Sequence, residues 1–232
     1  MSGVTLSAPE WEPAWEPEGE ASWRARADAC WLLARAFMPP PHGWRFRDWF
    51  EPLLADLEDL AAPLQLDLAA VQAAARQVAE LRRDTEDGGG PGADWLVAYA
   101  ALFLTPPVLA PLNTGLLLEG SLAGWVAQQA KACYQTAGFE PCEDFHDLPD
   151  HVAMQLEFMA RLLDRAALDI EARALVESFS HHFPAAWAPL LQQACQRAAP
   201  REPAGHVYAA LAGLIPQVLR TANEPRAHGS PA

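Results

Sequence analysis

Apolar residues recur three or four positions apart along most of the chain, the spacing that puts them on one face of an α-helix. Four such stripes stand out: Trp23, Ala27, Cys30 and Phe37; Val71, Ala75, Val78 and Leu81; Val152, Leu156, Met159 and Leu163; Val207, Leu211, Leu214 and Val218. No stretch alternates with period two for long, so the pattern predicts helices and essentially no strands.

Cap and breaker residues divide this pattern into elements. Ser22 and Asp67 are suitable N-caps, Gly138 is placed as a C-terminal stop, and prolines follow Phe37 and Leu104. The resulting helices are expected over residues 23–37, 44–60 with an interruption near Pro52, 67–83, 95–104, 116–137, 149–167, 169–182 and 207–218. We therefore expect an all-α fold, a single globular bundle of about eight to ten helices.

Composition shifts mark the ends and one internal linker. Residues 1–21 combine three prolines with five glutamates and lack helical periodicity, so we expect an acidic, mobile tail in which Trp11 and Trp15 are unusual. A Gly-rich linker is expected at 84–92, within a helical domain spanning 22–222, and a flexible C-terminal tail at 223–232. The linker lacks the lysine and flanking strand of a phosphate-binding loop, so we predict no nucleotide site there.

Charge narrows the classes of partner. With 16 Lys and Arg against 30 Asp and Glu, the 232-residue chain has a formal charge of −14, which repels phosphate backbones and anionic lipid. A helical DNA-binding regulator is therefore disfavoured, and a cationic peptide or protein segment is favoured.

Location and redox state follow from simple absences in the sequence. Residues 1–20 carry neither a basic segment nor an apolar run of the secretory type, and the longest apolar run, 96–104, is too short for a bilayer span. The four cysteines are widely spaced and predicted to be reduced. We expect a cytoplasmic protein without cofactors.

The segment 146–163, HDLPDHVAMQLEFMARLL, offers the strongest local signals for chemistry. Asp147 as N-cap, Pro149 in the first turn and Asp150 closing a capping box would start a helix. The functional alternative places Asp150 and His151 at the mouth of a groove, where the carboxylate binds a guanidinium and the imidazole adds pH sensitivity.

Two ordered motifs carry a family resemblance. Tyr99, Leu102 and Phe103 match a Y-x-x-L-F element, and 147–151 corresponds to an E-P-x-D-H element with Asp150 and His151 retained. Asp147 stands in place of the usual glutamate, and Pro149 gives an L-P-D-H version. From about Trp23 to Arg220 the chain resembles the TorD/DmsD/NarJ family of redox-enzyme maturation chaperones.

The resemblance implies a TorD-like fold and a non-catalytic, system-specific chaperone. Its partner would be the catalytic subunit of a molybdopterin-dependent oxidoreductase, bound through the twin-arginine leader or the body and held for cofactor insertion before export. The alternative is a NarJ-like assembly factor for a membrane oxidoreductase facing the cytoplasm, as a monomer or a domain-swapped dimer. The implied peptide-binding residues are Tyr99, Leu102, Phe103, Asp147, Pro149, Asp150 and His151. Ordinary core packing is the alternative explanation for the three apolar ones.

Two rival functions remain. Cys142, His146 and His151, or the pair His181 and His182, supply metal-ligand types, but Cys142 and His146 lack a second clustered pair. An enzyme using Asp150 and His151 as acid and base is disfavoured because neighbours on a helix point about 100° apart. The chain also lacks a nucleophile motif.

Overall fold

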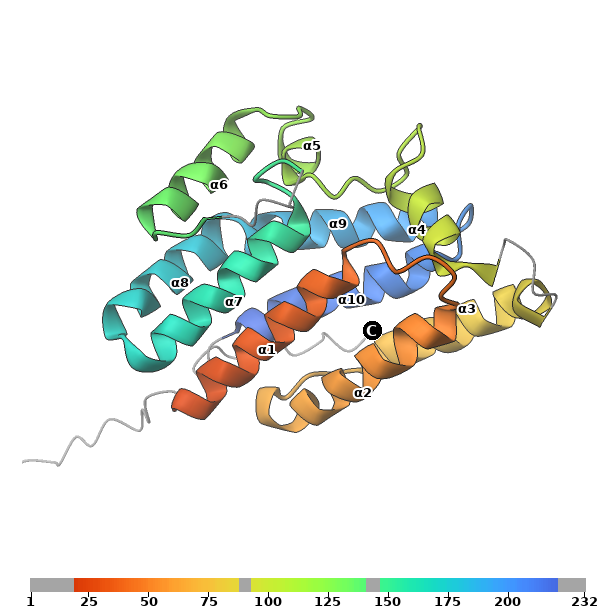
Figure 1. Cartoon of the computed structure of the whole chain (residues 1–232), viewed down its shortest axis with the longest axis horizontal. Helices are drawn as coiled ribbons and strands as arrows, with labels where there is room; N and C mark the ends of the chain where they lie inside the picture. The colour runs from red at the N-terminus through yellow and green to blue at the C-terminus, as the bar shows by residue number, and fades with distance from the viewer. Residues whose placement is uncertain (1–18, 88–92, 141–146, 221–232) are drawn as a thin grey trace, which may run out of the picture.

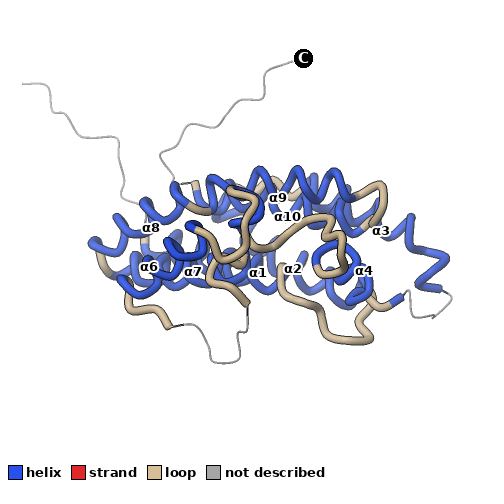
Figure 2. The backbone as a smooth tube through the Cα atoms, turned by 90° about the horizontal axis from the view of Figure 1, so that it is seen from above, coloured by secondary structure: helices blue, strands red, loops and turns tan. Residues whose placement is uncertain are grey.

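Ten helices make up nearly all of the structure, a computed structural model that describes residues 19–87, 93–140 and 147–220 (Figure 1). Their bounds are α1 Glu20–Ala36, α2 Phe46–Leu64, α3 Ala69–Asp87, α4 Trp95–Phe103, α5 Thr114–Leu118, α6 Trp125–Thr136, α7 Val152–Leu168, α8 Ile170–His182, α9 Pro184–Ala198 and α10 Ala204–Leu219. In those residues there is no strand, only an isolated bridge between Asn113 and His151 (Figure 2). The predicted all-α bundle is confirmed.

Short polar residues start several of these helices. The Asp94 side chain accepts from the backbone N–H of Leu96 at α4, and Asp169 accepts from Glu171 at α8. These bonds satisfy donors that lack a partner inside the helix. Pro184 opens α9, where its missing N–H costs nothing.

Helix α7 lies between α1 and α8, with α1 packed along one side and α8 along another (Figure 1). All four residues of its predicted stripe, Val152, Leu156, Met159 and Leu163, are completely buried. Helices α9 and α10 pack against each other, α10 also contacts α3, and α5 lies against α6 and α9. The apolar faces predicted from periodicity therefore meet in one continuous core.

A buried arginine joins the first helix to the last. Arg26 on α1 donates from Nε to the Val218 carbonyl oxygen at 3.1 Å and from Nη2 to the Leu219 carbonyl oxygen at 3.0 Å. Carbonyl groups in the last turn of a helix have no partner within the helix, so the guanidinium caps α10. Its planar fork suits two neighbouring acceptors better than an ammonium would.

The prediction of a single helix over 116–137 was wrong. The structure has two helices, α5 and α6, separated by residues 119–124. Gly120 and Ala123 have φ values of +70° and +55° there, so the backbone turns out of the right-handed helix. Gly138, with φ of +69°, follows α6 as predicted for its C-terminal stop.

Other helix boundaries also differ from the prediction, and α1 starts at Glu20 with Gly19 as its N-cap, so Ser22 is not the cap. Helix α2 continues through Pro52 instead of breaking there, and α3 runs to Asp87, four residues into the expected linker 84–92. Helix α7 begins at Val152 instead of Pro149 because the backbone before it pairs with another segment, described below. Residues 88–92 lie outside the described residues, as do 1–18 and 221–232, so the tail boundaries remain predictions.

We expect Arg26→Met to lower the free energy of unfolding by about 1–3 kcal/mol, because one buried and one partly buried carbonyl group lose charge-assisted hydrogen bonds. Urea unfolding measures the change. The control is Arg24→Met on the same helix, where an exposed ion pair with Glu20 is removed and the change should stay within about 0.5 kcal/mol. Equal effects of the two substitutions would contradict the capping role.

Candidate functional site

The segment 148–152 is held to the segment before α5 by backbone hydrogen bonds. The N–H of Thr114 donates to the Asp150 carbonyl oxygen at 3.0 Å. The N–H of Val152 donates to the Leu112 carbonyl oxygen at 2.9 Å. The Tyr134 hydroxyl of α6 adds a bond to the Pro149 carbonyl oxygen at 2.7 Å. This junction ties the starts of α5 and α7 to each other and to the last turn of α6, although the segments before α5 and α7 are about 35 residues apart.

A buried polar network stabilises the junction. The Asp150 carboxylate is fully buried and its Oδ2 accepts from the N–H of Gly115 at 2.7 Å. A Cβ at position 115 would lie 2.9 Å from that oxygen and 2.7 Å from the Ser121 carbonyl oxygen, so only glycine fits. Asp150 therefore holds the N-terminus of α5 and is not exposed at the mouth of a groove; its binding of a guanidinium remains a prediction.

Gln155 extends the network to α9. Its Nε2 donates to the Thr114 hydroxyl at 2.8 Å, and its Oε1 accepts from the Trp187 indole N–H at 2.6 Å. All three side chains are buried, so the fold would be destabilised if any of their polar groups lost its hydrogen-bond partner. Sequence analysis missed Gln155, whose only signal was a polar residue within an otherwise apolar stretch.

His151, not Asp147, is the N-cap of α7. Its Nδ1 accepts from the N–H of Ala153 at 3.2 Å, which requires a neutral ring with the proton on Nε2. Burial lowers the pKa of His151 below its ordinary value of 6.5, although Asp147 and Asp150 oppose the shift. The Asp147 carboxylate, whose Oδ2 is 3.9 Å from Nε2, is about half exposed and accepts from Asn113 and Leu148.

Tyr99, Leu102 and Phe103 lie in the core and not on an open wall. Each is at least 95% buried, and the rings of Tyr99 and Phe103 pack on Tyr208 of α10. The Tyr99 hydroxyl donates to the Phe37 carbonyl oxygen at 3.0 Å, and burial, with a smaller contribution from Asp147, raises the pKa of Tyr99. In this conformation the three residues position α4, and a direct role in peptide binding remains a prediction.

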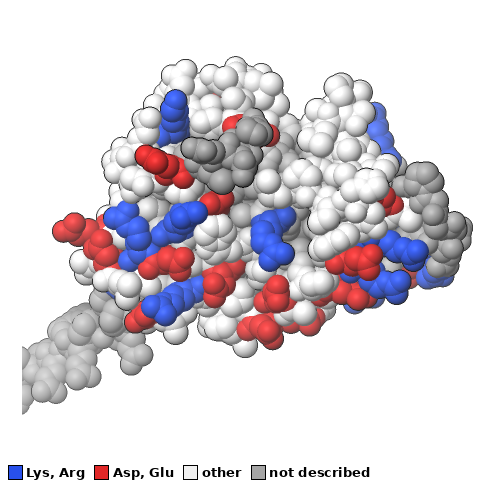
Figure 3. Space-filling view, viewed as in Figure 1, with Lys and Arg blue, Asp and Glu red and all other residues white. Residues whose placement is uncertain are grey.

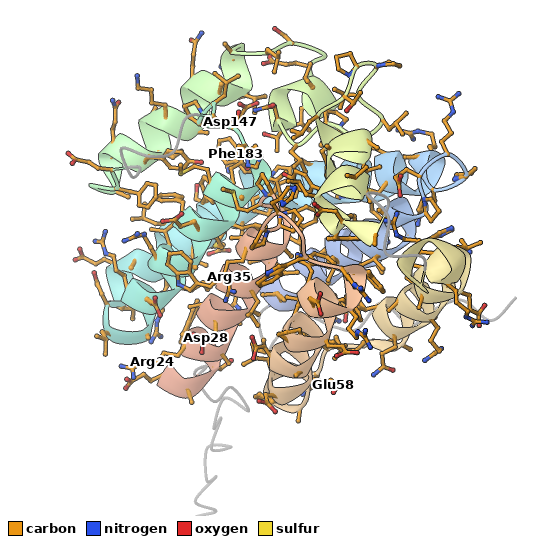
Figure 4. All side chains as sticks on the ribbon, turned by 45° about the vertical axis from the view of Figure 1, so that its right-hand side comes forward. Arg24, Asp28, Arg35, Glu58, Asp147 and Phe183 are labelled. Atoms are coloured by element: carbon orange, nitrogen blue, oxygen red, sulfur yellow. The ribbon has the colours of Figure 1, made fainter. Side chains whose placement is uncertain are left out.

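An apolar groove runs between α6, α7 and α8, with a cavity volume of about 350 Å³. Its open side carries Trp125, which is 65% exposed, and Leu175, while Phe158 and Phe179 form its floor. Leu118 and Phe183 close the end near α5, and Thr136 and Ala137 border the other end. Figure 4 labels Phe183 on the same upper side of the bundle as Asp147.

Sequence analysis did not predict the groove, although it considered one lining residue, His182, as a metal ligand. Trp125, Gln129, Ala132 and Thr136 share one face of α6 at helical spacing, but glutamine, alanine and threonine do not mark an apolar stripe. The groove also needs α8, which the chain reaches only after α7. Only the packing of the three helices defines it.

Charge differs at the two ends of the groove. Glu119, which is exposed, accepts from the N–H of Val126 at the α5 end. At the opposite end the guanidinium of Arg165 donates to the Ala137 carbonyl oxygen at 3.0 Å. Figure 3 shows few charged side chains over α5 and the loop after α4, whereas charges of both signs crowd the surface around α1 and α7.

The described parts of the chain contain no cluster of three His, Cys, Asp or Glu side chains arranged for a metal ion. Cys142 and His146, two of the ligand types considered above, lie outside those parts. Among the same residues, no helix combines the length and apolar character needed to cross a bilayer.

Comparison with known proteins places the chain in a recognised group. Residues 58–193, more than half of the chain and inclusive of both motifs, match the family model described as nitrate reductase delta subunit. A crystal structure of a proposed redox enzyme maturation protein from Archaeoglobus fulgidus aligns with a TM-score of 0.49 and 19% identity, covering 90% of this chain and 98% of that chain. No curated protein sequence gives a significant match.

The stability of the protein should fall as the pH drops below about 6.5, because the unfolded chain takes up a proton at His151 before the folded chain does. Above that pH the neutral His151 cap contributes its full stabilisation to the folded protein. His151→Asn, which keeps a capping side chain but does not titrate, should flatten this part of the profile. Urea unfolding between pH 5 and 8 measures both proteins, and an unchanged slope in the variant would contradict the prediction.

Asp150→Ala should lower the free energy of unfolding by about 1–3 kcal/mol, because the buried N–H of Gly115 loses its acceptor. Asp147→Ala, at a half-exposed position three residues earlier, should cost at most about 1 kcal/mol. Thermal and urea unfolding compare the two. A larger loss from the Asp147 substitution would show that the junction is held differently.

Proposed function

The chain belongs to the nitrate reductase delta subunit family of redox-enzyme maturation chaperones, and from this premise we propose that it binds the catalytic subunit of a molybdopterin-dependent oxidoreductase. It holds this client, through the twin-arginine leader, until the cofactor is inserted, and it carries out no chemical step itself. We place this activity in the cytoplasm. The observation that carries the proposal is the apolar groove between α6, α7 and α8.

The groove fits the apolar part of a leader. An amphipathic helical peptide binds by setting residues three and four positions apart into an apolar channel. Trp125 and Leu175 stand on facing helices at the open side and would contact such residues from both directions. A large exposed tryptophan is also the type of side chain that dominates binding energy at protein interfaces.

Carboxylates near the α5 end fit the arginine pair. Glu119 lies next to the groove residues Leu118 and Val126. The Asp147 carboxylate accepts a hydrogen bond from Asn113, the N-cap of α5. Both carboxylates reach solvent, unlike Asp150. A leader would then lie with its arginines toward α5 and its apolar segment along α6. The net charge of −14 speeds its capture.

The second candidate is an assembly factor for a membrane oxidoreductase that faces the cytoplasm. The family description as nitrate reductase delta subunit favours it. Such a factor would bind an apolar segment of the catalytic subunit without needing an arginine pair. Both candidate functions use the groove. They differ in whether the carboxylates of Glu119 and Asp147 contribute to binding the client.

A synthetic 20-residue peptide with two adjacent arginines followed by an alanine- and leucine-rich segment tests the proposal by calorimetric titration. Leu175→Asp should weaken binding about tenfold or more, because the peptide's apolar anchor then meets a charge. Leu81→Asp on α3 is the control, since Leu81 is also an exposed leucine on a helix, 58% exposed against 38% for Leu175, but lies outside the groove, and it should leave the affinity unchanged.

A peptide with two glutamines in place of the arginines separates the candidates. If the leader is the ligand, the glutamine peptide binds more weakly, and Glu119→Gln together with Asp147→Asn removes most of that difference. Equal binding of both peptides favours the assembly factor. Absence of binding to either peptide, together with absence of binding to an immature molybdoenzyme, would overturn the proposed function.

A further inference from the structure

The negative charge of the chain is unevenly distributed along the sequence. Residues 84–160 contain eleven Asp and Glu and only one Lys or Arg, Lys131, so this stretch holds −10 of the total charge of −14. It forms α4, α5, α6 and the first half of α7. A cationic ligand is therefore attracted most strongly to this part of the protein.

Two carboxylates of this stretch meet beside Gly115 in α5. A Cβ at position 115 would lie 2.9 Å from the Asp150 Oδ2 atom and 3.5 Å from the Glu119 Oε1 atom. The other Asp150 oxygen, Oδ1, is buried and has no hydrogen-bond partner among the described residues. Over the same residues, neither carboxylate forms an ion pair with a lysine or arginine. Two neighbouring negative charges without a counter-ion favour a cation at the exposed one, Glu119.

An exposed tryptophan stands next to Glu119. Trp125 is the first residue of α6, and its side chain is 65% exposed at the α5 end of the groove. The Glu119 carboxylate lies against Gly124 and accepts from the N–H of Val126 at 3.2 Å, so it touches the residues on both sides of Trp125. Side chains on a helix tilt toward its N-terminus, which directs the Trp125 ring toward the segment that carries Glu119.

The N-terminus of α6 acts against a cation at this position, but only weakly. Its aligned peptide groups amount to about half a positive charge, less than the charge of either carboxylate. The single lysine of the stretch, Lys131, lies six residues beyond Trp125, about 9 Å along the helix axis and about 120° around it. The local charge around Trp125 and Glu119 is therefore negative.

Arginine already stacks on tryptophan elsewhere in this protein. The distance from guanidinium carbon to ring centroid is 4.8 Å for Arg26 and Trp23, 5.2 Å for Arg82 and Trp95, and 5.4 Å for Arg161 and Trp31. No lysine or arginine of the described segments stacks on Trp125 in this way. The exposed indole face is open to a cation supplied by another molecule.

We propose that Trp125 and Glu119 form a subsite for a guanidinium group, which stacks on the indole and donates to the carboxylate while the buried Asp150 charge adds to the attraction. A guanidinium is planar and weakly hydrated, whereas a lysine ammonium is compact and strongly hydrated. The subsite therefore selects arginine over lysine. The identity of its ligand, an arginine of the client's leader, rests on the proposed function.

Two peptides that differ only in an Arg-Arg or a Lys-Lys pair test the selectivity by calorimetric titration. The wild-type protein should bind the arginine peptide about threefold more tightly or better, the factor given by an exposed cation–π contact. Trp125→Leu keeps an apolar side chain in the groove wall but removes the aromatic face, so this ratio should fall close to one. Trp125→Phe should give an intermediate ratio.

Two control substitutions accompany this test. Trp44→Leu removes another exposed tryptophan, 41% exposed and outside the groove, and should leave the ratio unchanged. Glu119→Gln keeps an acceptor for the N–H of Val126 but loses the charge, so it should weaken binding of both peptides. If both peptides bind and Trp125→Leu leaves their ratio as in the wild type, the subsite is overturned and the proposed function stands.

A small ligand separates the subsite from the proposed function when neither peptide binds. The indole N–H signal of Trp125 is the nuclear magnetic resonance signal that Trp125→Leu removes from the spectrum of the full chain. N-acetylarginine amide should shift this signal more than N-acetyllysine amide does at equal concentration. That result without peptide binding would overturn the proposed function and support the subsite. Equal shifts, or no shift with either compound, would then overturn the subsite as well.

Discussion

The arrangement of the bundle depends on the buried junction between the segment before α5 and the start of α7. Backbone bonds between 112–114 and 150–152 fix where α7 begins, and the Asp150 carboxylate fixes the N-terminus of α5. Because these groups are buried, leaving any of them unpaired would cost more free energy than the bond contributes on balance, since the group would lose its hydration without gaining a partner. The junction therefore sets the positions of α5 and α6 relative to α7.

The groove is a consequence of that placement. Tyr134 of α6 bonds to the Pro149 carbonyl oxygen and its ring packs on Phe158 of α7, so α6 is held at one edge. Between α6, α7 and α8 the packing leaves the apolar groove open to solvent. The residues of the 147–151 motif thus help to hold α6 beside α7 without lining the groove.

This arrangement separates the residues that hold the fold from those offered to a ligand. Asp150, His151 and Gln155 are buried among fixed partners, whereas Trp125, Leu175 and Glu119 lie on the surface. A chaperone must bind and release without rearranging its core. Surface side chains around a rigid junction meet that requirement, since preorganised sites lose less entropy on binding.

The sequence by itself determined the helical fold, because the stripe at Val152, Leu156, Met159 and Leu163 and caps such as Asp169 act within a few residues. It also pointed to 147–151, through motif and helix-start signals. Only the tertiary structure decided that Asp150 is buried, that His151 is the cap, and that Tyr99, Leu102 and Phe103 are core. These outcomes depend on bonds and contacts between residues 35 to more than 100 positions apart, such as Gly115 with Asp150 and Tyr99 with Tyr208, and such pairings leave no mark in local periodicity.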